Sequence, residues 1–404
     1  MELRIPSFPI HIGLAAFVAG IFLSNSILQM AAGVLLLLWL IELSTGHRPA
    51  RWESASVFLS AFFLSGLLAL LLSPDPGFSF SKIIRYLIPL TAIPIAHWSR
   101  GAPPTVMRRY GRWMVALGTL AASAGIWHHW QGEWRASGFY GGPYTLASAL
   151  AFSMPIGIGL WLSSRGWPRL LIGIALTGQF AGLCTTVTRG AVLGLILALL
   201  VGSIVWYRRG NIPHTRWVLF PIWGGLVLLF IGFGLLSPDG RINPFLYSEL
   251  AEQNIVVDVS SGRIKLPGEA LELQRRSFRT RAGWRLLVGH GLNSRSLNFQ
   301  DNYGSWESDY LEALMDQGIP GLALLVGLYG LFLRRLGLVL FSGKISLDAF
   351  TLGVGMSALA FWVQSFFTLQ LLSMNSSAHF ALLLPLLEWC LRRQGTEVKP
   401  VSET

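Results

Sequence analysis

Residues 189–207 read RGAVLGLILALLVGSIVWY, an apolar run whose only charge is the leading Arg189. A helix that crosses a bilayer needs roughly 20 mostly apolar residues, so this stretch predicts a membrane-spanning helix. Similar stretches recur along the 404 residues, of which 52% are hydrophobic and only 13% charged. Soluble domains carry about 25% charged residues. The composition therefore excludes a disordered chain, a coiled coil and an ordinary cytosolic enzyme, and it predicts an all-α polytopic membrane protein.

The pattern of apolar stretches predicts about twelve transmembrane helices. They are expected near residues 8–24, 27–43, 55–73, 83–99, 112–128, 144–163, 167–186, 189–207, 217–236, 309–333, 348–372 and 376–391. The fourth range contains Arg85 and the seventh contains Gln179, which makes these two the least typical of a membrane span. The chain then divides into helices one to nine (1–236), one large periplasmic loop (237–307), helices ten to twelve (308–391) and a cytoplasmic tail (392–404).

Lysine and arginine are distributed unevenly between the two sides of these spans. Most basic residues in short loops follow even-numbered spans, whereas the short loops after odd-numbered spans hold only Lys82, Arg85, Arg135 and Arg189. Cytoplasmic loops are enriched in Lys and Arg, so both termini are expected in the cytoplasm. The same rule accounts for the net charge of +11 without a nucleic-acid partner. The long loop 237–307 is exempt from it and carries nine basic residues.

Arginines gather at the predicted outer face. Arg135 precedes the sixth span, Arg189 begins the eighth, and Arg275 and Arg276 lie in the long loop. The guanidinium group binds phosphate oxygens through two hydrogen bonds and keeps its charge. Arg189 is the strongest single candidate for an anion site, because a helix N-terminus also favours negative charge. The alternative is that each arginine pairs with a lipid headgroup or a loop carboxylate.

Carboxylates stand just before the tenth span, in the stretch 306–322, WESDYLEALMDQGIPGL. Ser308 is suited to a helix N-cap, and Asp309 and Glu312 are suited to a first helical turn. These carboxylates either only cap the helix or include a general base at the membrane surface. No Asp, Glu or Lys lies at the middle of a predicted span, which argues against an ion-coupled transporter. The two cysteines are far apart in sequence, and no metal site is expected.

These segments resemble the superfamily of O-antigen ligases and Wzy-type O-antigen polymerases. The match consists of Tyr310-Leu311-x-x-Leu314-x-x-x-Gly318-x-x-Gly321-Leu322, Val288-Gly289-His290-Gly291, Thr188-Arg189-Gly190, and Arg135-Ala-Ser-Gly138-Phe139 with Pro143. The resemblance implies a multi-pass protein of the bacterial inner membrane with an active site at the periplasmic face. It also implies a donor glycan on undecaprenyl diphosphate, an acceptor hydroxyl on a glycan or on the lipid A core, and no metal or other cofactor.

The chain departs from this family at one position of the motif. Glu307 stands where the family has a histidine proposed as catalytic base, and Ser308 stands where it has an asparagine. By resemblance, Arg189, Arg135 and Arg275 or Arg276 would bind the diphosphate, with Arg263 as an alternative. Glu307 would be the base, with Asp309 second. Further candidates are His290, His379 and Tyr310, which opens the matched motif.

Several functions stay open at this stage. Within the family, a polymerase and a ligase are both consistent with the sequence. A transporter or flippase of lipid-linked glycans is one alternative, and a non-catalytic partner of a polysaccharide-assembly complex is another. The expected partners are the lipid-linked donor, the acceptor, membrane lipids and other polysaccharide-assembly proteins.

Overall fold

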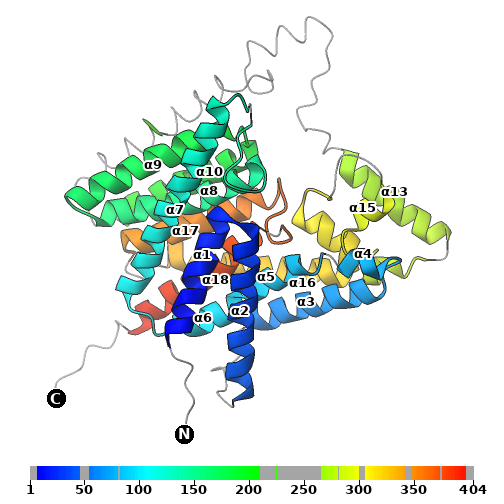
Figure 1. The fold of residues 1–404 in the computed structure, drawn as a ribbon. Coiled ribbons are helices and arrows are strands. Elements are labelled where there is room, and N and C mark those ends of the chain that lie inside the picture. The colour runs from blue at the N-terminus through cyan, green and yellow to red at the C-terminus, as the bar shows by residue number, and fades with distance from the viewer. Residues whose placement is uncertain are drawn as a thin grey trace, which may run out of the picture.

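The fold was taken from a computed structural model of the chain. It describes residues 7–45, 54–80, 82–133, 135–209, 224–225, 265–280, 282–299, 305–342, 347–373 and 375–396. Every regular element named within these residues is a helix, as the all-α prediction requires. Figure 1 shows the helices wrapped around one another, with α1 beginning and α18 ending in the same part of the molecule.

The elements follow the chain in this order. They are α1 Ser7–Leu23, α2 Asn25–Ser44, α3 Ser54–Leu71, α4 Pro76–Phe80, α5 Ile84–Leu90, α6 Ala92–Ser99, α7 Pro104–Trp130, α8 Pro143–Ser163, α9 Trp167–Thr185, α10 Arg189–Arg208, α13 Leu266–Arg279, α14 Arg285–Val288, α15 Ser294–Asn298, α16 Asp309–Phe341, α17 Ala349–Gln364 and α18 Ser377–Thr396.

Six of these segments are long and apolar enough to cross a membrane. They are Asn25–Ser44, Ser54–Leu71, Pro76–Ser99, Pro143–Ser163, Arg189–Arg208 and Asp309–Phe341. Helices α1 and α17 are apolar but shorter, and α7, α9 and α18 are helical over their predicted ranges without meeting the same standard. The predicted span at 217–236 lies outside the described residues except for 224–225. These six helices support a protein that crosses the membrane several times.

The predicted fourth span, 83–99, is broken into two helices, α5 and α6. Pro89 lies inside α5 and Pro94 inside α6. Proline lacks an N–H donor and its ring collides with the preceding turn, so it kinks or breaks a helix.

Helices approach closely where glycine faces a neighbouring backbone. A methyl group added at Gly159 of α8 would overlap the carbonyl oxygen of Ala349 in α17. Small residues at such crossings are typical of packed membrane helices. The polar Gln179 of α9 is also satisfied inside the protein: its Nε2 donates to the Val115 carbonyl at 2.7 Å, and its Oε1 accepts from Ser153 at 2.8 Å.

Helix α16 is kinked at Gly318, whose φ of 74° lies in the left-handed region. The short helices α13, α14 and α15 of the long loop gather at the N-terminal end of α16, as Figure 1 shows at the right. Trp306 and Met315 pack there with Ala270 and Leu273 of α13 in a small buried cluster. The described part of the predicted periplasmic loop therefore forms a cap on this end of the bundle.

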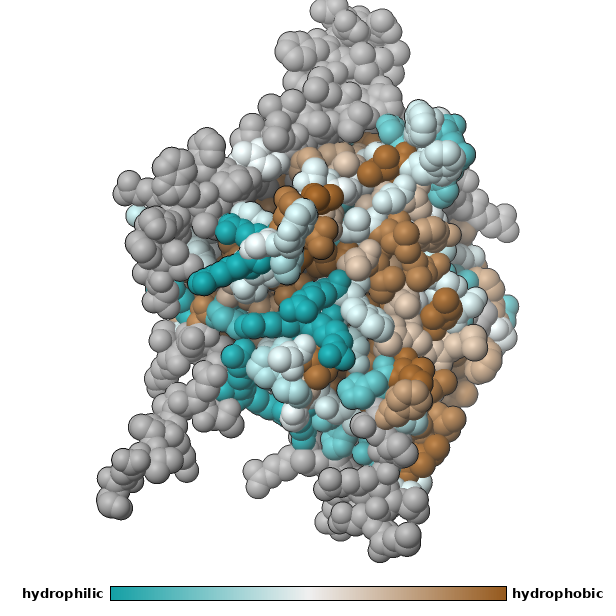
Figure 2. Space-filling model, turned by 60° about the vertical axis from the view of Figure 1, so that its left-hand side comes forward, coloured by the Kyte–Doolittle hydropathy of each residue, from teal (hydrophilic) through white to brown (hydrophobic). Residues whose placement is uncertain are grey.

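Large apolar side chains are exposed on the outside of the bundle, among them Met30, Leu64 and Ile174. Figure 2 shows one face of the molecule, where a broad hydrophobic area adjoins a hydrophilic one. Apolar surface of this extent is unusual on a soluble monomer and fits contact with lipid.

Candidate functional site

The end of α9 and the start of α10 bring two predicted arginine segments together. The Ala136 N–H donates to the Thr185 carbonyl at 3.0 Å, which places the segment of Arg135 beside the turn that leads to Arg189. Arg189 is half-buried in the first turn of α10. The structure therefore gathers these two candidates on one side of the molecule.

Arg135 lies over an aromatic ring. Its guanidinium carbon is 4.7 Å from the centre of the Tyr144 ring, in the first turn of α8. A cation–π contact orients a guanidinium group without neutralising it. Arg135 is thus held in position by α8 while its charge still acts on the surroundings.

The loop after α17 connects this arginine pair to α16. A methyl group at Gly190 would lie 3.1 Å from Cβ of Phe367, so the loop passes directly against the start of α10. Further along it, Asn375 Nδ2 donates to Thr145 Oγ1 at 3.2 Å. The loop after α17 is therefore in contact with α10 at Phe367 and with α8 at Asn375.

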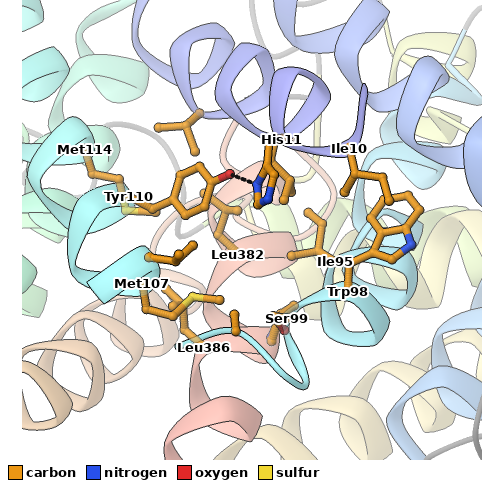
Figure 3. A pocket seen from close by; sticks show the side chains of 15 residues that line it. Ile10, His11, Ile95, Trp98, Ser99, Met107, Tyr110, Met114, Leu382 and Leu386 are labelled. Carbon is orange, nitrogen blue, oxygen red and sulfur yellow. Dashed lines mark hydrogen bonds between the residues drawn. The ribbon is translucent and has the colours of Figure 1, made fainter. Parts of the chain in front are cut away.

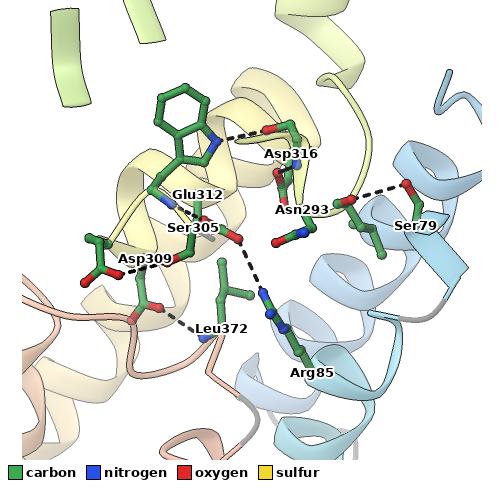
Figure 4. A network of polar contacts seen from close by, with 12 residues as sticks. Ser79, Arg85, Asn293, Ser305, Asp309, Glu312, Asp316 and Leu372 are labelled. Carbon is green, nitrogen blue, oxygen red and sulfur yellow. Dashed lines mark hydrogen bonds and ion pairs between the residues drawn. The ribbon is translucent and has the colours of Figure 1, made fainter. Parts of the chain in front are cut away.

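Asp309 fixes the same loop from the other side. Its carboxylate accepts hydrogen bonds from the backbone N–H groups of residues 370, 371 and 372 at 2.9–3.1 Å, and from the Tyr329 hydroxyl at 2.7 Å. The side chain is fully buried. Figure 4 shows it at the edge of a polar network around the start of α16. These contacts assign Asp309 a positioning role and leave it no access to an acceptor hydroxyl.

Glu312 and Asp316 hold the capping segment. Glu312 accepts from the backbone N–H of Trp306 at 2.8 Å, and Asp316 accepts from the N–H groups of Asn293 and Ser294 at 2.7 and 2.8 Å. Both carboxylates are buried, one helical turn apart on α16. Together they hold Asn293 and Ser294 on one side and Trp306 on the other.

Arg85 supplies a counter-charge to this acidic face. Its guanidinium Nη1 lies 3.6 Å from Glu312 Oε1, and its side chain is 24% exposed. Figure 4 shows Arg85 reaching toward Glu312 from the neighbouring helix. Arg85 and Asp316 were not among the site residues expected from the sequence, and Glu312 was considered only as one of the carboxylates that either cap the helix or act as a base. The available signal was Arg85 itself, because a charge inside an apolar stretch usually has a partner within the protein.

Three residues other than glycine have positive φ in the described part of the chain: Val187 (51°), Asn293 (61°) and Glu307 (56°). Val187 stands two residues before Arg189, Asn293 is held by Asp316, and Glu307 directly precedes Ser308, the N-cap of α16. Such conformations are costly for residues with a side chain, and they are frequent at functional sites. Val187 and Glu307 therefore stand next to candidate residues, whereas Asn293 belongs to the cap at the end of α16.

Glu307 is the carboxylate of this group that is only half-buried. Its Oε1 accepts from the Ser305 hydroxyl at 3.2 Å. It stands between the buried Trp306 and the start of α16, and it lies two residues from Asp309, which holds the loop against α10. Among the acidic residues of 307–316, Glu307 is the one whose side chain is partly exposed.

The two candidate histidines are buried. His290 is 1% exposed, and its backbone N–H donates to the Met315 carbonyl at 2.8 Å. Burial, together with the charge of Arg285, lowers the pKa of His290 to about 4. His379 packs its ring 4.7 Å from that of Phe152. Neither position favours the role of a general base toward an external acceptor.

The remaining candidates lie elsewhere. Arg275 and Arg276 are exposed on α13, which packs on α14 and α16, and Arg276 pairs with Glu272 at 3.1 Å. In Figure 1, α13 lies apart from α8, α9 and α10, so the structure does not join these arginines to Arg135 and Arg189. Tyr310 stacks on Phe366 at 5.3 Å between ring centres. Arg263 lies outside the described residues.

The described residues contain no group of three or more His, Cys, Asp or Glu side chains that could hold a metal ion. Comparison of the chain with models of known protein families and with curated protein sequences finds no match. The resemblance to O-antigen ligases and polymerases therefore rests on the motifs quoted above.

Proposed function

We propose that the chain is a membrane glycosyltransferase that moves a glycan from a polyprenyl diphosphate to an acceptor hydroxyl. One observation supports this most strongly. The Ala136 N–H bonds to the Thr185 carbonyl, Gly190 lies against Phe367, and the loop that contains Phe367 is held by Asp309. These three contacts link the segments of Arg135 and Arg189 to the start of α16, where Glu307 stands. Arginines and a carboxylate are the groups that such a transfer requires.

In the proposed reaction, Arg189 and Arg135 bind the diphosphate of the donor. Glu307 accepts the proton of the acceptor hydroxyl, and the acceptor oxygen bonds to the anomeric carbon as the bond from that carbon to the diphosphate breaks. The arginines stabilise the negative charge that the leaving diphosphate gains. The diphosphate already activates the sugar, so the proposed step uses no metal. A direct displacement of this kind inverts the anomeric centre.

We also propose the detailed topology that the sequence predicts. Twelve spans, cytoplasmic termini and a periplasmic site would place the reaction outside the cytoplasm, where the donor is the carrier-linked glycan. The acceptor hydroxyl belongs to another glycan for a polymerase and to the lipid A core for a ligase. Both reactions use the same two functions, diphosphate binding and deprotonation of a hydroxyl.

A deletion strain tests the proposal and separates the two reactions. Surface glycans are resolved on a gel, and the carrier-linked pool is analysed beside them. Single repeats on the lipid A core without a long-chain ladder identify a polymerase. Polymer that accumulates on the carrier while none reaches the core identifies a ligase. An unchanged gel together with an unchanged pool, for every surface glycan of the cell, contradicts the proposal.

A further inference from the structure

An apolar cavity and an apolar surface both lie outside the candidate site. The cavity, of about 180 Å³, lies between α1, α6, α7 and α18 and is lined in part by the contacting side chains of His11 and Tyr110 (Figure 3). The surface belongs to the cap and consists of large side chains that are between 47% and 59% exposed. We call it the apolar cap surface, and its members are Leu271, Phe278, Trp284 and Leu287. Exposed apolar surface marks a contact with a protein or a membrane, and the elements around the cap indicate which of the two it is.

The four side chains belong together because their elements touch. Leu271 and Phe278 are two helical turns apart on α13, so they lie on the same side of that helix. A methyl group added at Gly283 would lie 2.9 Å from Cδ1 of Phe278, which places the Phe278 ring against residue 283. Trp284 follows directly, and Leu287 comes one turn later in α14. The apolar cap surface therefore runs from α13 to α14.

Helix α14 lies at one end of the membrane-spanning part of α16. A methyl group added at Gly318 would overlap the Leu287 carbonyl oxygen, so the two backbones touch. The longest uncharged stretch of α16 runs from Gln317 to Leu333. A crossing needs roughly 20 mostly apolar residues, so Gly318 is expected close to one boundary of the apolar membrane core. Because α14 packs at this position, Leu287 is expected at the level of the membrane surface.

The apolar cap surface also continues the lipid-facing side of the bundle. Exposed leucines share one side of α3, namely Leu64, Leu68 and Leu71. The chain that leaves α3 touches the cap, because a methyl group added at Gly291 would overlap the Ser73 side chain. Ile319, which directly follows the kink of α16, is exposed as well. Lipid that covers the exposed sides of α3 and α16 would therefore extend onto α14.

The charges on α13 are suited to a phospholipid surface. Its two carboxylates, Glu269 and Glu272, are each paired with an arginine of the protein. Arg275 is exposed, and its spacing of four residues from Leu271 and three from Phe278 makes these side chains neighbours on the helix surface. A guanidinium group in this place can bind a lipid phosphate while the adjacent apolar side chains enter the bilayer.

We propose that the cap lies on the membrane and inserts the apolar cap surface into the adjacent leaflet, with Arg275 at the level of the lipid phosphates. Trp284 fits this placement, because tryptophan is enriched where the apolar core of a membrane meets water. Arg276, two residues before Phe278, points to the other side of α13 and remains in water. The proposal is independent of glycosyl transfer, since it requires no role for Arg189 or Glu307.

The test places a fluorescent probe on either side of α13 in the full-length protein. Phe278→Cys, Leu287→Cys and the matched control Arg276→Cys are labelled with an environment-sensitive maleimide, and the buried Cys184 and Cys390 give a low background. Each protein is reconstituted in liposomes with and without phospholipid that carries a nitroxide near the start of its acyl chain. We expect the nitroxide to quench the probes at positions 278 and 287 several-fold more than the probe at 276. The first two should also emit at shorter wavelength.

Thermal midpoints in detergent establish that each variant is folded. If Phe278→Cys does not fold, Leu271→Cys replaces it, since Leu271 lies on the same side of α13. An unquenched probe at either apolar position would overturn the proposal and would leave the apolar cap surface to another protein. Equal quenching at position 276 would overturn it too, because α13 would then not be oriented by its apolar side.

Discussion

Glu307 combines two properties that rarely occur together. Its backbone is in the left-handed region, where glycine or asparagine is favoured, and its side chain is the accessible carboxylate of the site. A residue with a Cβ costs roughly 1–2 kcal/mol in that conformation. The protein accepts this cost at the position that we propose as the catalytic base, which fits the general concentration of backbone strain at functional sites.

Two substitutions at Glu307 separate chemistry from conformation. Glu307→Gln keeps the shape and should lower the transfer rate roughly 10²–10⁴-fold, because the amide cannot accept the proton. Glu307→Gly relieves the left-handed strain and should leave the protein as stable or more stable, by up to about 1 kcal/mol, while transfer is lost. Transfer assays and thermal denaturation of both variants check this. A normal rate in Glu307→Gln would exclude Glu307 as the base.

The buried His290 is expected to make the stability of the protein depend on pH. Its pKa is about 4 in the folded protein, against an ordinary value of 6.5, because the ring is buried and Arg285 is near. The unfolded chain therefore binds more protons than the folded protein between these two values, so stability falls as pH falls from about 6.5 toward 4. We expect the thermal midpoint of His290→Gln to fall less steeply over this interval. Identical slopes in the variant and the wild type would contradict this assignment.

At the scale of elements, much of the helical pattern was predictable from hydrophobic length. Every predicted span with described residues contains helix, and the break between α5 and α6 occurs where the sequence has Pro89 and Pro94. The segments of Arg135 and Arg189 were also predicted, and the structure joins them. The pairing of Arg85 with Glu312 was not predictable, because it joins residues 227 positions apart and depends on how α5 packs near α16.

Because Arg85 contacts Glu312, we expect substitutions at these two positions to have non-additive effects on the free energy of unfolding. Arg85→Gln alone leaves a buried carboxylate without its counter-charge, which costs about 3 kcal/mol in comparable sites. The double variant Arg85→Gln/Glu312→Gln removes both charges, so its destabilisation should be smaller than the sum of the single effects by about 2 kcal/mol. Denaturation of the four proteins in detergent gives this coupling energy. Additive effects would show that the two groups do not interact.

At the scale of the whole molecule, the cap of α13, α14 and α15 and the loops around Arg135 and Arg189 are expected on the periplasmic side. The basic residues of the short loops predict this orientation, since cytoplasmic loops are enriched in Lys and Arg. The exposed apolar surface of the bundle fits the lipid between the two sides. The site would then lie where a carrier-linked glycan is presented at the membrane surface.

Cysteine labelling tests this orientation directly. Cys184 and Cys390 are both buried, so new cysteines should be labelled against a low background. Gln131→Cys lies in the loop after α7 and Arg165→Cys lies in the loop after α8, and both positions are exposed. A membrane-impermeant maleimide added to spheroplasts should label Gln131→Cys and not Arg165→Cys. The reverse pattern would place the candidate site in the cytoplasm.

The central claim is that Arg189 binds the diphosphate of a lipid-linked glycan during transfer. It is tested most directly with purified protein in liposomes that contain the carrier-linked donor and an acceptor glycan. We predict transfer by the wild type and by Arg169→Ala, whose guanidinium lies over the Trp161 ring on the predicted cytoplasmic side. Arg189→Ala should be folded and slower by roughly 10²–10³-fold, and Arg189→Lys should also be impaired, because it cannot bind two phosphate oxygens through a planar fork. A normal rate in Arg189→Ala would contradict the account.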